Sequence, residues 1–150
     1  MKADALDRRI LSELAASAKN SSREIAKKVG ATNVTVLHRI RRLEEEGAIE
    51  GYRASLDYER LGYGLQAIIE IRSSKDPSPQ FDKYLRAHPS VTQVFQTSGD
   101  YDIIIMAHFR NREEFKAFIA ELKNYDLTRE LTSRIILDRI ADKPLQIHDA

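Results

Sequence analysis

The sequence SSREIAKKVGATNVTVLHRIRRL, residues 21–43, has the pattern of two short amphipathic helices joined by a tight turn. Ser21 and Glu24 have the spacing of a capping box, in which each side chain bonds the backbone N–H of the other residue and starts a helix. Gly30 favours the left-handed conformation that ends this helix. Thr32 can cap the next helix. This stretch therefore predicts a helix-turn-helix.

The second of these helices has one apolar face, formed by Val36, Ile40 and Leu43, which we expect to be buried. A helix with an opposite, polar face fits the major groove of DNA, where side chains near its N-terminus reach base edges and flanking arginines neutralise phosphates. The pattern predicts a DNA-reading face formed by Asn33, Val34, Leu37, His38 and Arg41, with Arg39 and Arg42 at its sides facing phosphates.

Charge along the chain supports this prediction. Residues 19–42 contain seven Lys or Arg and one Glu, although the whole chain has a net charge of only +1. Such a local excess attracts polyanions. The same charges also suit the solvated faces of two helices, and the apolar Val34 and Leu37 suit a protein contact. A sensing or assembly partner without DNA binding therefore remains an alternative.

The flanking residues extend this region. Leu6, Ile10, Leu11 and Leu14 recur at helical spacing and predict a preceding helix. After Gly47, the stretch IEGYRASLD alternates weakly and predicts a β wing or strand.

Residues 64–150 have the order strand, helix, strand, strand, helix, strand. The expected strands are LQAIIEIRS, VTQVFQTS, YDIIIMAHF and LTSRIILDRI, and the expected helices are PQFDKYLRA and the segment that begins at Asn111. Gly99-Asp100 is a strong signal for a tight hairpin between the two middle strands. We expect an α+β chain, with a helix-turn-helix (winged-helix-like) domain at 1–52, a linker at 53–63 and a ferredoxin-like βαββαβ domain at 64–150.

A sheet covered by helices on one face leaves its other face open. Here we expect that face to carry Ile68 and Ile104, which favours homodimerisation through the sheets.

Several function classes are disfavoured by composition. The chain has no cysteine, so it has neither disulfides nor thiolate metal sites. It has no apolar stretch of about 18 residues for a membrane span. Its N-terminus lacks the apolar core of a signal peptide, so we expect a cytoplasmic protein. The histidines have no metal-ligand spacing, and no Gly-rich phosphate loop appears, so we expect no cofactor. These histidines are His38, His88, His108 and His148.

The order of motifs resembles the Lrp/AsnC (feast/famine) family of prokaryotic transcriptional regulators. The resemblance covers nearly the whole chain and rests on LDRRILSEL, SREIAKKVGATNVTVLHRIRRLEEEGAIEGYRASLD, LGY and TSGDYDIII, in that order. It implies a homodimer, often assembled further, that binds double-stranded promoter DNA. It also places Thr32 where the family opens its recognition helix and Arg39 at a recurrent arginine, and we add Thr35 to the DNA-reading set.

The resemblance further implies a small effector, usually an amino acid, held near the GDYD loop. The loop residues match as Gly99, Asp100, Tyr101 and Asp102, and Thr132 and Ser133 lie where the family tends to place ligand-facing hydroxyls. A carboxylate such as Asp102, at the mouth of an apolar strand, needs a partner: a backbone N–H, a basic side chain or a ligand ammonium.

One departure concerns the turn before the last strand. The family usually has Pro-Gly-Val there, whereas this chain has Tyr125-Asp126-Leu127, which puts the effector pocket in question. The sirohaem decarboxylases share this architecture and provide an enzymatic alternative, although the strongly basic helix-turn-helix favours the regulator.

Overall fold

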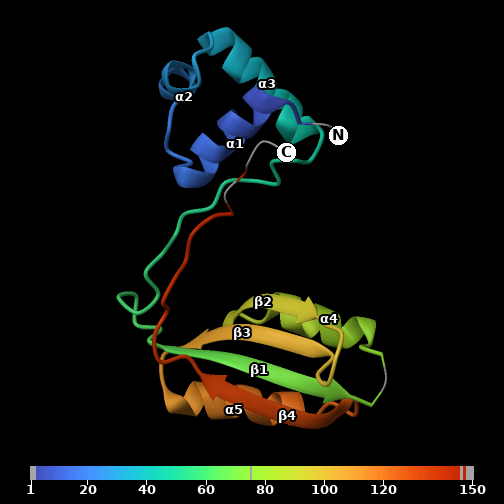
Figure 1. The fold of residues 1–150 in the computed structure, drawn as a ribbon. Coiled ribbons are helices and arrows are strands. Elements are labelled where there is room, and N and C mark those ends of the chain that lie inside the picture. The colour runs from blue at the N-terminus through green and yellow to red at the C-terminus, as the bar shows by residue number, and fades with distance from the viewer. Residues whose placement is uncertain (1–2, 75, 146, 148–150) are drawn as a thin grey trace. The chain divides into compact units, whose positions relative to one another are not determined.

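A computed structural model describes residues 3–74, 76–145 and 147, which fall into two compact units (Figure 1). One unit contains residues 3–55 together with 141–145 and 147, and the other contains residues 56–140. The chain therefore passes from one unit to the other twice. The sequence pattern assigns the whole tail to the C-terminal domain, whereas its described part belongs to the first unit. The termini at 1–2 and 148–150, including His148, lie outside the described residues.

The first unit is a three-helix domain. It consists of α1 (Ala5–Ala16), α2 (Ser22–Val29) and α3 (Asn33–Glu45), and α2 and α3 form the predicted helix-turn-helix. The apolar faces of the helices meet in one core, whose buried members are Ile10, Ile25, Ala26, Val29 and Val36.

The helix boundaries follow from their caps. The Ser21 hydroxyl accepts from the Glu24 N–H, and the Glu24 carboxylate accepts from the Ser21 N–H, as predicted. Gly30 ends α2 with a left-handed φ of 66°, and Thr32 caps α3 by accepting from the Thr35 N–H. These caps fix the angle at which α3 leaves α2.

The predicted wing is absent from the described structure. Residues 49–57 form no strand, and nearly all of them are exposed. Their alternation is weak and interrupted by Gly51, and a strand forms only where a neighbouring edge pairs with its backbone.

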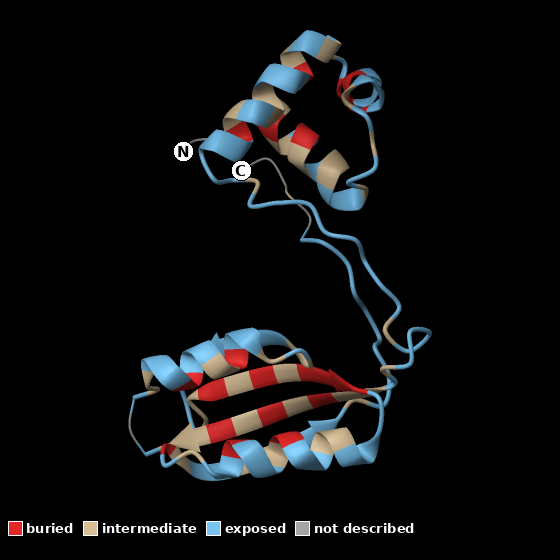
Figure 2. Ribbon diagram, turned by 180° about the vertical axis from the view of Figure 1, so that it is seen from behind, coloured by how far each residue is buried: buried red, intermediate tan, exposed pale blue. Residues whose placement is uncertain are grey.

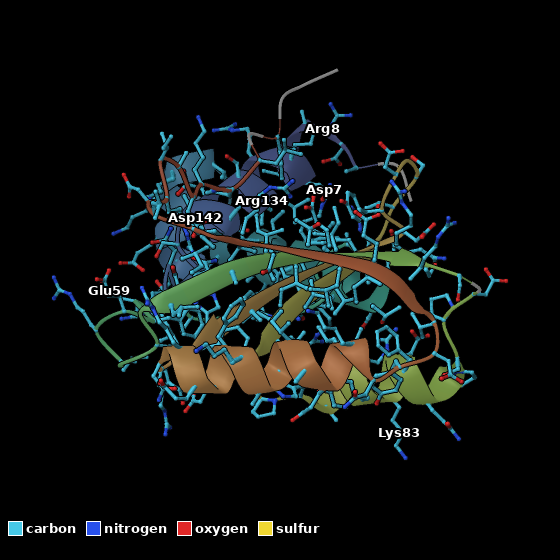
Figure 3. The ribbon with its side chains drawn as sticks, turned by 90° about the horizontal axis from the view of Figure 1, so that it is seen from below. Asp7, Arg8, Glu59, Lys83, Arg134 and Asp142 are labelled. Carbon is cyan, nitrogen blue, oxygen red and sulfur yellow. The ribbon has the colours of Figure 1, made fainter. Side chains whose placement is uncertain are left out.

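The second unit is an antiparallel sheet with two helices. Its elements are β1 (Leu65–Ser73), α4 (Pro79–Ala87), β2 (Val91–Gln96), β3 (Ile103–Phe109), α5 (Arg112–Lys123) and β4 (Thr128–Ile135), with strand order β2-β3-β1-β4. Both helices lie on the same side of the sheet (Figure 3). Buried residues alternate with less buried ones along β1 and β3 (Figure 2). This is the predicted βαββαβ arrangement.

The connection between β2 and β3 is longer than predicted. The first strand ends at Gln96 and the second begins at Ile103, instead of flanking a tight Gly99-Asp100 turn. The Thr97 N–H donates to the Asp102 carbonyl at 2.8 Å and closes the loop below the glycine. A loop of this length can present side chains and backbone groups that a two-residue turn would not.

The two units have separate hydrophobic cores, so we expect their stabilities to respond separately to core truncation. Ile105→Ala removes a fully buried side chain of the second unit and should destabilise that unit by about 2–5 kcal/mol. Ile25→Ala should do the same in the first unit. Calorimetry should show that each substitution lowers only one unfolding transition. A common shift of all transitions by either variant would contradict independent units.

Candidate functional site

Helix α3 is attached to α1 by a buried carboxylate. Asp7 is fully buried. Its Oδ1 accepts from the Arg39 guanidinium at 3.0 Å, and its Oδ2 accepts from the Arg42 guanidinium at 2.5 Å. Oδ2 also accepts from the Asp4 N–H at 3.0 Å. The buried charge is therefore paired on both oxygens, as a buried carboxylate requires.

Asp4 extends this cluster. Its carboxylate accepts from the Asp7 N–H at 2.9 Å and also pairs with Arg39. The backbone N–H of Asp7, followed by the guanidinium of Arg39, lowers the pKa of Asp4 to about 2. The two carboxylates in turn raise the pKa of Arg39. The N-terminal cap of α1 and the orientation of α3 thus depend on the same four side chains.

The structure places Arg39 and Arg42 differently from the sequence interpretation, which has both facing phosphates from the sides of α3. Both are instead engaged by Asp7, and the Nε of Arg42 also lies 3.8 Å from the Glu46 carboxylate. The physical reason is the desolvation of Asp7, which demands cationic partners. Their guanidinium groups orient α3 within the unit.

The solvent-facing side of α3 carries several of the other predicted residues. Val34 is 75% exposed and Leu37 is 51% exposed. Thr32, His38 and Arg41 are also exposed. No ion pair holds Arg41 within the described part of the chain, so its guanidinium is available to a phosphate or a base. These five residues form one surface from the N-terminus of α3 to its middle.

Two residues of the predicted DNA-reading set are less exposed to solvent. Asn33 is half-buried, and its Oδ1 is covered and has no hydrogen-bond partner among the described residues. Thr35 is also half-buried, and its hydroxyl lies 2.8 Å from that of Thr32. Bidentate pairing of Asn33 with adenine requires both amide atoms, so the Asn33 side chain must rotate outward to read a base.

The second candidate site is the loop between β2 and β3. Gly99 has φ 123°, a conformation that favours glycine. The Asp102 carboxylate turns back to the sheet, where its Oδ2 accepts from the Ser73 N–H at 2.7 Å and from the Ser73 hydroxyl at 3.0 Å. The bond from the Ser73 N–H, and then that from its hydroxyl, lowers the pKa of Asp102. Of the partners expected for Asp102, the structure has the backbone N–H.

Tyr101 and Thr132 meet, with their hydroxyl oxygens 3.1 Å apart. Ser133 does not join them, because successive strand residues face opposite sides of the sheet and Ser133 pairs in register with the core residue Ile69. Asp100 remains at the tip of the loop with its side chain 90% exposed, 3.8 Å from Arg72.

The altered turn before β4 is part of the core. Leu127 is buried, and the Tyr125 ring packs on Phe81 and Tyr84 with centroids 4.8 and 5.3 Å apart. The Leu127 carbonyl accepts from the Ser74 N–H at 2.8 Å. The turn therefore contributes to the helix-covered side of the sheet.

Sequence reasoning missed Asp7 and Asp4. The three-residue spacing of Asp4 and Asp7 before an apolar helix was an available signal for a cap. Asp7 pairs with Arg39 and Arg42, which follow it in the sequence by 32 and 35 positions. No local sequence pattern indicates a pairing over that separation. Among the described residues, no three side chains gather as a metal site, and no helix is long and apolar enough to cross a membrane.

Comparisons with known proteins cover both units. Residues 4–50 match the winged helix-turn-helix DNA-binding domain, and residues 66–145 match the Lrp/AsnC ligand binding domain. The chain is 36% identical over 142 residues to an uncharacterised HTH-type transcriptional regulator of Pyrococcus furiosus, covering 95% of this chain and 96% of that protein.

Solved structures agree with this match. The structure of AsnC from E. coli is 25% identical, covers 97% of this chain and 99% of its own, and has a TM-score of 0.85. A transcriptional regulator from Neisseria meningitidis in complex with L-Met is 26% identical, covers 95% of this chain and 94% of its own, and has a TM-score of 0.88.

Asp7→Asn tests the attachment of α3. The variant leaves two guanidinium groups without their shared anion, so we expect the first unit to lose about 1–3 kcal/mol of stability. Glu45→Gln, at an exposed position of α3, is the matched control and should change little. Thermal unfolding monitored by circular dichroism measures both. Equal effects of the two substitutions would contradict a structural role for the buried pair.

Proposed function

The chain belongs to the Lrp/AsnC family of helix-turn-helix transcriptional regulators, and we propose that α3 reads operator DNA while the loop at residues 97–102 holds a small zwitterionic effector. A DNA-binding domain and a ligand-binding domain are present in one chain. The family consists of transcriptional regulators, which decides against the enzymatic alternative of a sirohaem-decarboxylase-like protein.

The exposed face of α3 is the observation that carries the DNA-reading proposal. Val34 and Leu37 can contact thymine methyl groups, and Arg41 can reach a base edge or a phosphate. The apolar exposure of Val34 and Leu37 suits a groove contact because α3 follows the turn of a helix-turn-helix. Arg39 and Arg42 support reading indirectly by holding α3 on Asp7.

The effector proposal rests on the groups that the loop presents. The Asp100 carboxylate, 90% exposed and 3.8 Å from Arg72, can accept from an ammonium group. The backbone around Gly99 has no side chain to block the approach of a ligand carboxylate. Tyr101 and Thr132 supply hydroxyls beside it. That the similar Neisseria meningitidis regulator was crystallised with L-Met supports an amino acid as the class of ligand.

We also propose that the chain self-associates through the open face of its sheet. Ile68 and Ile104 lie on this face, because the residues before and after each of them along the strand are buried in the core and successive strand residues face opposite sides of the sheet. Arg134 on β4 pairs with Glu70 on β1 across the same face. Half-buried apolar side chains around one ion pair are a suitable surface for a second copy.

Arg41→Ala should weaken binding to all DNA sequences and lower the salt dependence of log K by about one unit for each phosphate that is no longer neutralised. Asn33→Ala should instead relax the preference at one base position, costing roughly 1–3 kcal/mol there. Lys116→Ala, at an exposed position of α5, is the control. Operator selection from random DNA followed by salt titration measures both effects. If all three variants bind alike, α3 does not contact DNA and the partner-only alternative gains support.

Asp100→Asn should weaken the binding of an amino-acid effector by on the order of tenfold, since a charge-assisted hydrogen bond contributes roughly 1.5–3 kcal/mol. Calorimetry with the standard amino acids identifies the ligand first, and the variant is then compared with Asp82→Asn, an exposed carboxylate on α4. Gly99→Ala should also weaken binding. Absence of binding by every amino acid would overturn the effector proposal and leave the DNA proposal standing.

Ile104→Asp places a charge on the open sheet face and should convert the dimer into a monomer. Lys83→Asp makes a similar change on α4, on the other side of the sheet (Figure 3), and should leave the dimer intact. Light scattering at micromolar concentration distinguishes the two. A monomeric unsubstituted chain would rule out association through this face.

A further inference from the structure

The second unit has a cavity at the end of its sheet remote from the loop at 97–102. Its volume is about 310 Å³, at the lower end of the range of small-molecule sites. The loop that precedes β1, where Figure 3 labels Glu59, forms one wall, and the segment that follows β4 forms another. Its lining includes Tyr58, Glu59, Gln66, His108, Asp138 and Arg139.

A buried and unpartnered imidazole forms part of the cavity wall. His108, near the end of β3, is only 6% exposed. Its Nδ1 is buried and has no hydrogen-bond partner in the described part of the chain. The Tyr58 ring covers the imidazole, with centroids 4.5 Å apart. A buried polar atom without a partner costs free energy, so a ligand that reaches Nδ1 when the covering Tyr58 ring moves aside gains affinity there.

The charged residues that line the cavity determine which kind of ligand it can bind. Within the described residues, no ion pair joins Glu59 or Asp138, and both are exposed where they line the cavity. Arg139, a cationic lining residue, donates to the Gln66 side-chain oxygen at 3.3 Å. Burial, and then the charge of Arg139, lowers the pKa of His108 and so favours the neutral imidazole, which has one acceptor nitrogen. Carboxylates, an acceptor nitrogen and an aromatic ring together favour an ammonium group.

The cavity is separate from the proposed effector loop. Gln66 lies near the start of β1 and Ser73, which holds Asp102, at its end. Seven residue steps along a strand correspond to roughly 23 Å. The cavity walls are also the first and last segments of the second unit, which lead to the division points after Ser55 and Ile140. A ligand in the cavity contacts both segments that connect this unit to the DNA-binding unit.

We propose that this cavity is a second small-molecule site, which binds a short organic cation with a primary ammonium group between Glu59, Asp138 and His108. Occupancy restrains residues 56–64 and 136–139 together. The binding itself does not depend on the DNA or effector proposals.

The full chain is titrated with 1,4-diaminobutane as the probe and with 1,4-butanediol, of the same length but uncharged, as its control. Calorimetry should show saturable binding of the diamine and none of the diol. The double variant Glu59→Gln/Asp138→Asn should weaken binding by on the order of tenfold. Asp82→Asn/Glu113→Gln removes the same charge from exposed positions on α4 and α5 and should leave the affinity unchanged.

Hydrogen exchange locates the ligand. Addition of the diamine should slow exchange at residues 56–64 and 136–139. His108→Phe retains a ring against Tyr58 and removes the acceptor, so it should abolish this protection while circular dichroism stays unchanged. Absence of saturable binding, an equal loss in the control double variant, or protection at 97–102 instead of the two segments would each overturn the proposal.

Discussion

The buried carboxylate of Asp7 is the interaction on which the DNA-binding unit depends. An unpaired carboxylate in the core would cost several kcal/mol. Folding of the unit therefore requires that the guanidinium groups of Arg39 and Arg42 contact the Asp7 carboxylate. Both arginines are on α3, three residues apart, and they therefore fix the rotation of α3 about its own axis. With those two side chains directed at α1, Val34, Leu37 and Arg41 face solvent. The exposed face of α3 is thus a consequence of an ion cluster formed within the unit.

This cluster reduces the number of basic side chains in residues 19–42 that are available to a polyanion. Residues 19–42 are strongly basic in sequence, but Lys28 pairs with Glu13, and Arg39 and Arg42 pair with aspartates that precede the segment. The cations that neutralise carboxylates within the unit contribute little to attraction of a polyanion. The remaining attraction rests on exposed residues such as Arg41.

Local patterns predicted much of this fold, and non-local pairing explains what they missed. The Ser21 capping box, the Gly30 stop and the alternation along β1 each depend on residues within a few positions, and each prediction is confirmed. The predicted wing at 49–57 needed a neighbouring strand, and the expected tight turn at Gly99-Asp100 ignored the bond between Thr97 and Asp102. Likewise the sequence indicates that Asp102 needs a partner, but that partner, Ser73, lies on a strand that precedes it by 29 residues.

Strand β1 runs from one candidate ligand site to the other. One end of β1 holds the 97–102 loop through Ser73, and its other end, at Gln66, lines the cavity with His108. Strand β4 pairs with β1 along its length and continues through Ile136 and Ile140 into the tail that belongs to the first unit. Because packed strands shift as units and do not deform continuously, a ligand bound at either proposed site would bias the same pair of strands. Effects of the two ligands on DNA binding should therefore be coupled, and by linkage each should alter the affinity for the other by the same factor.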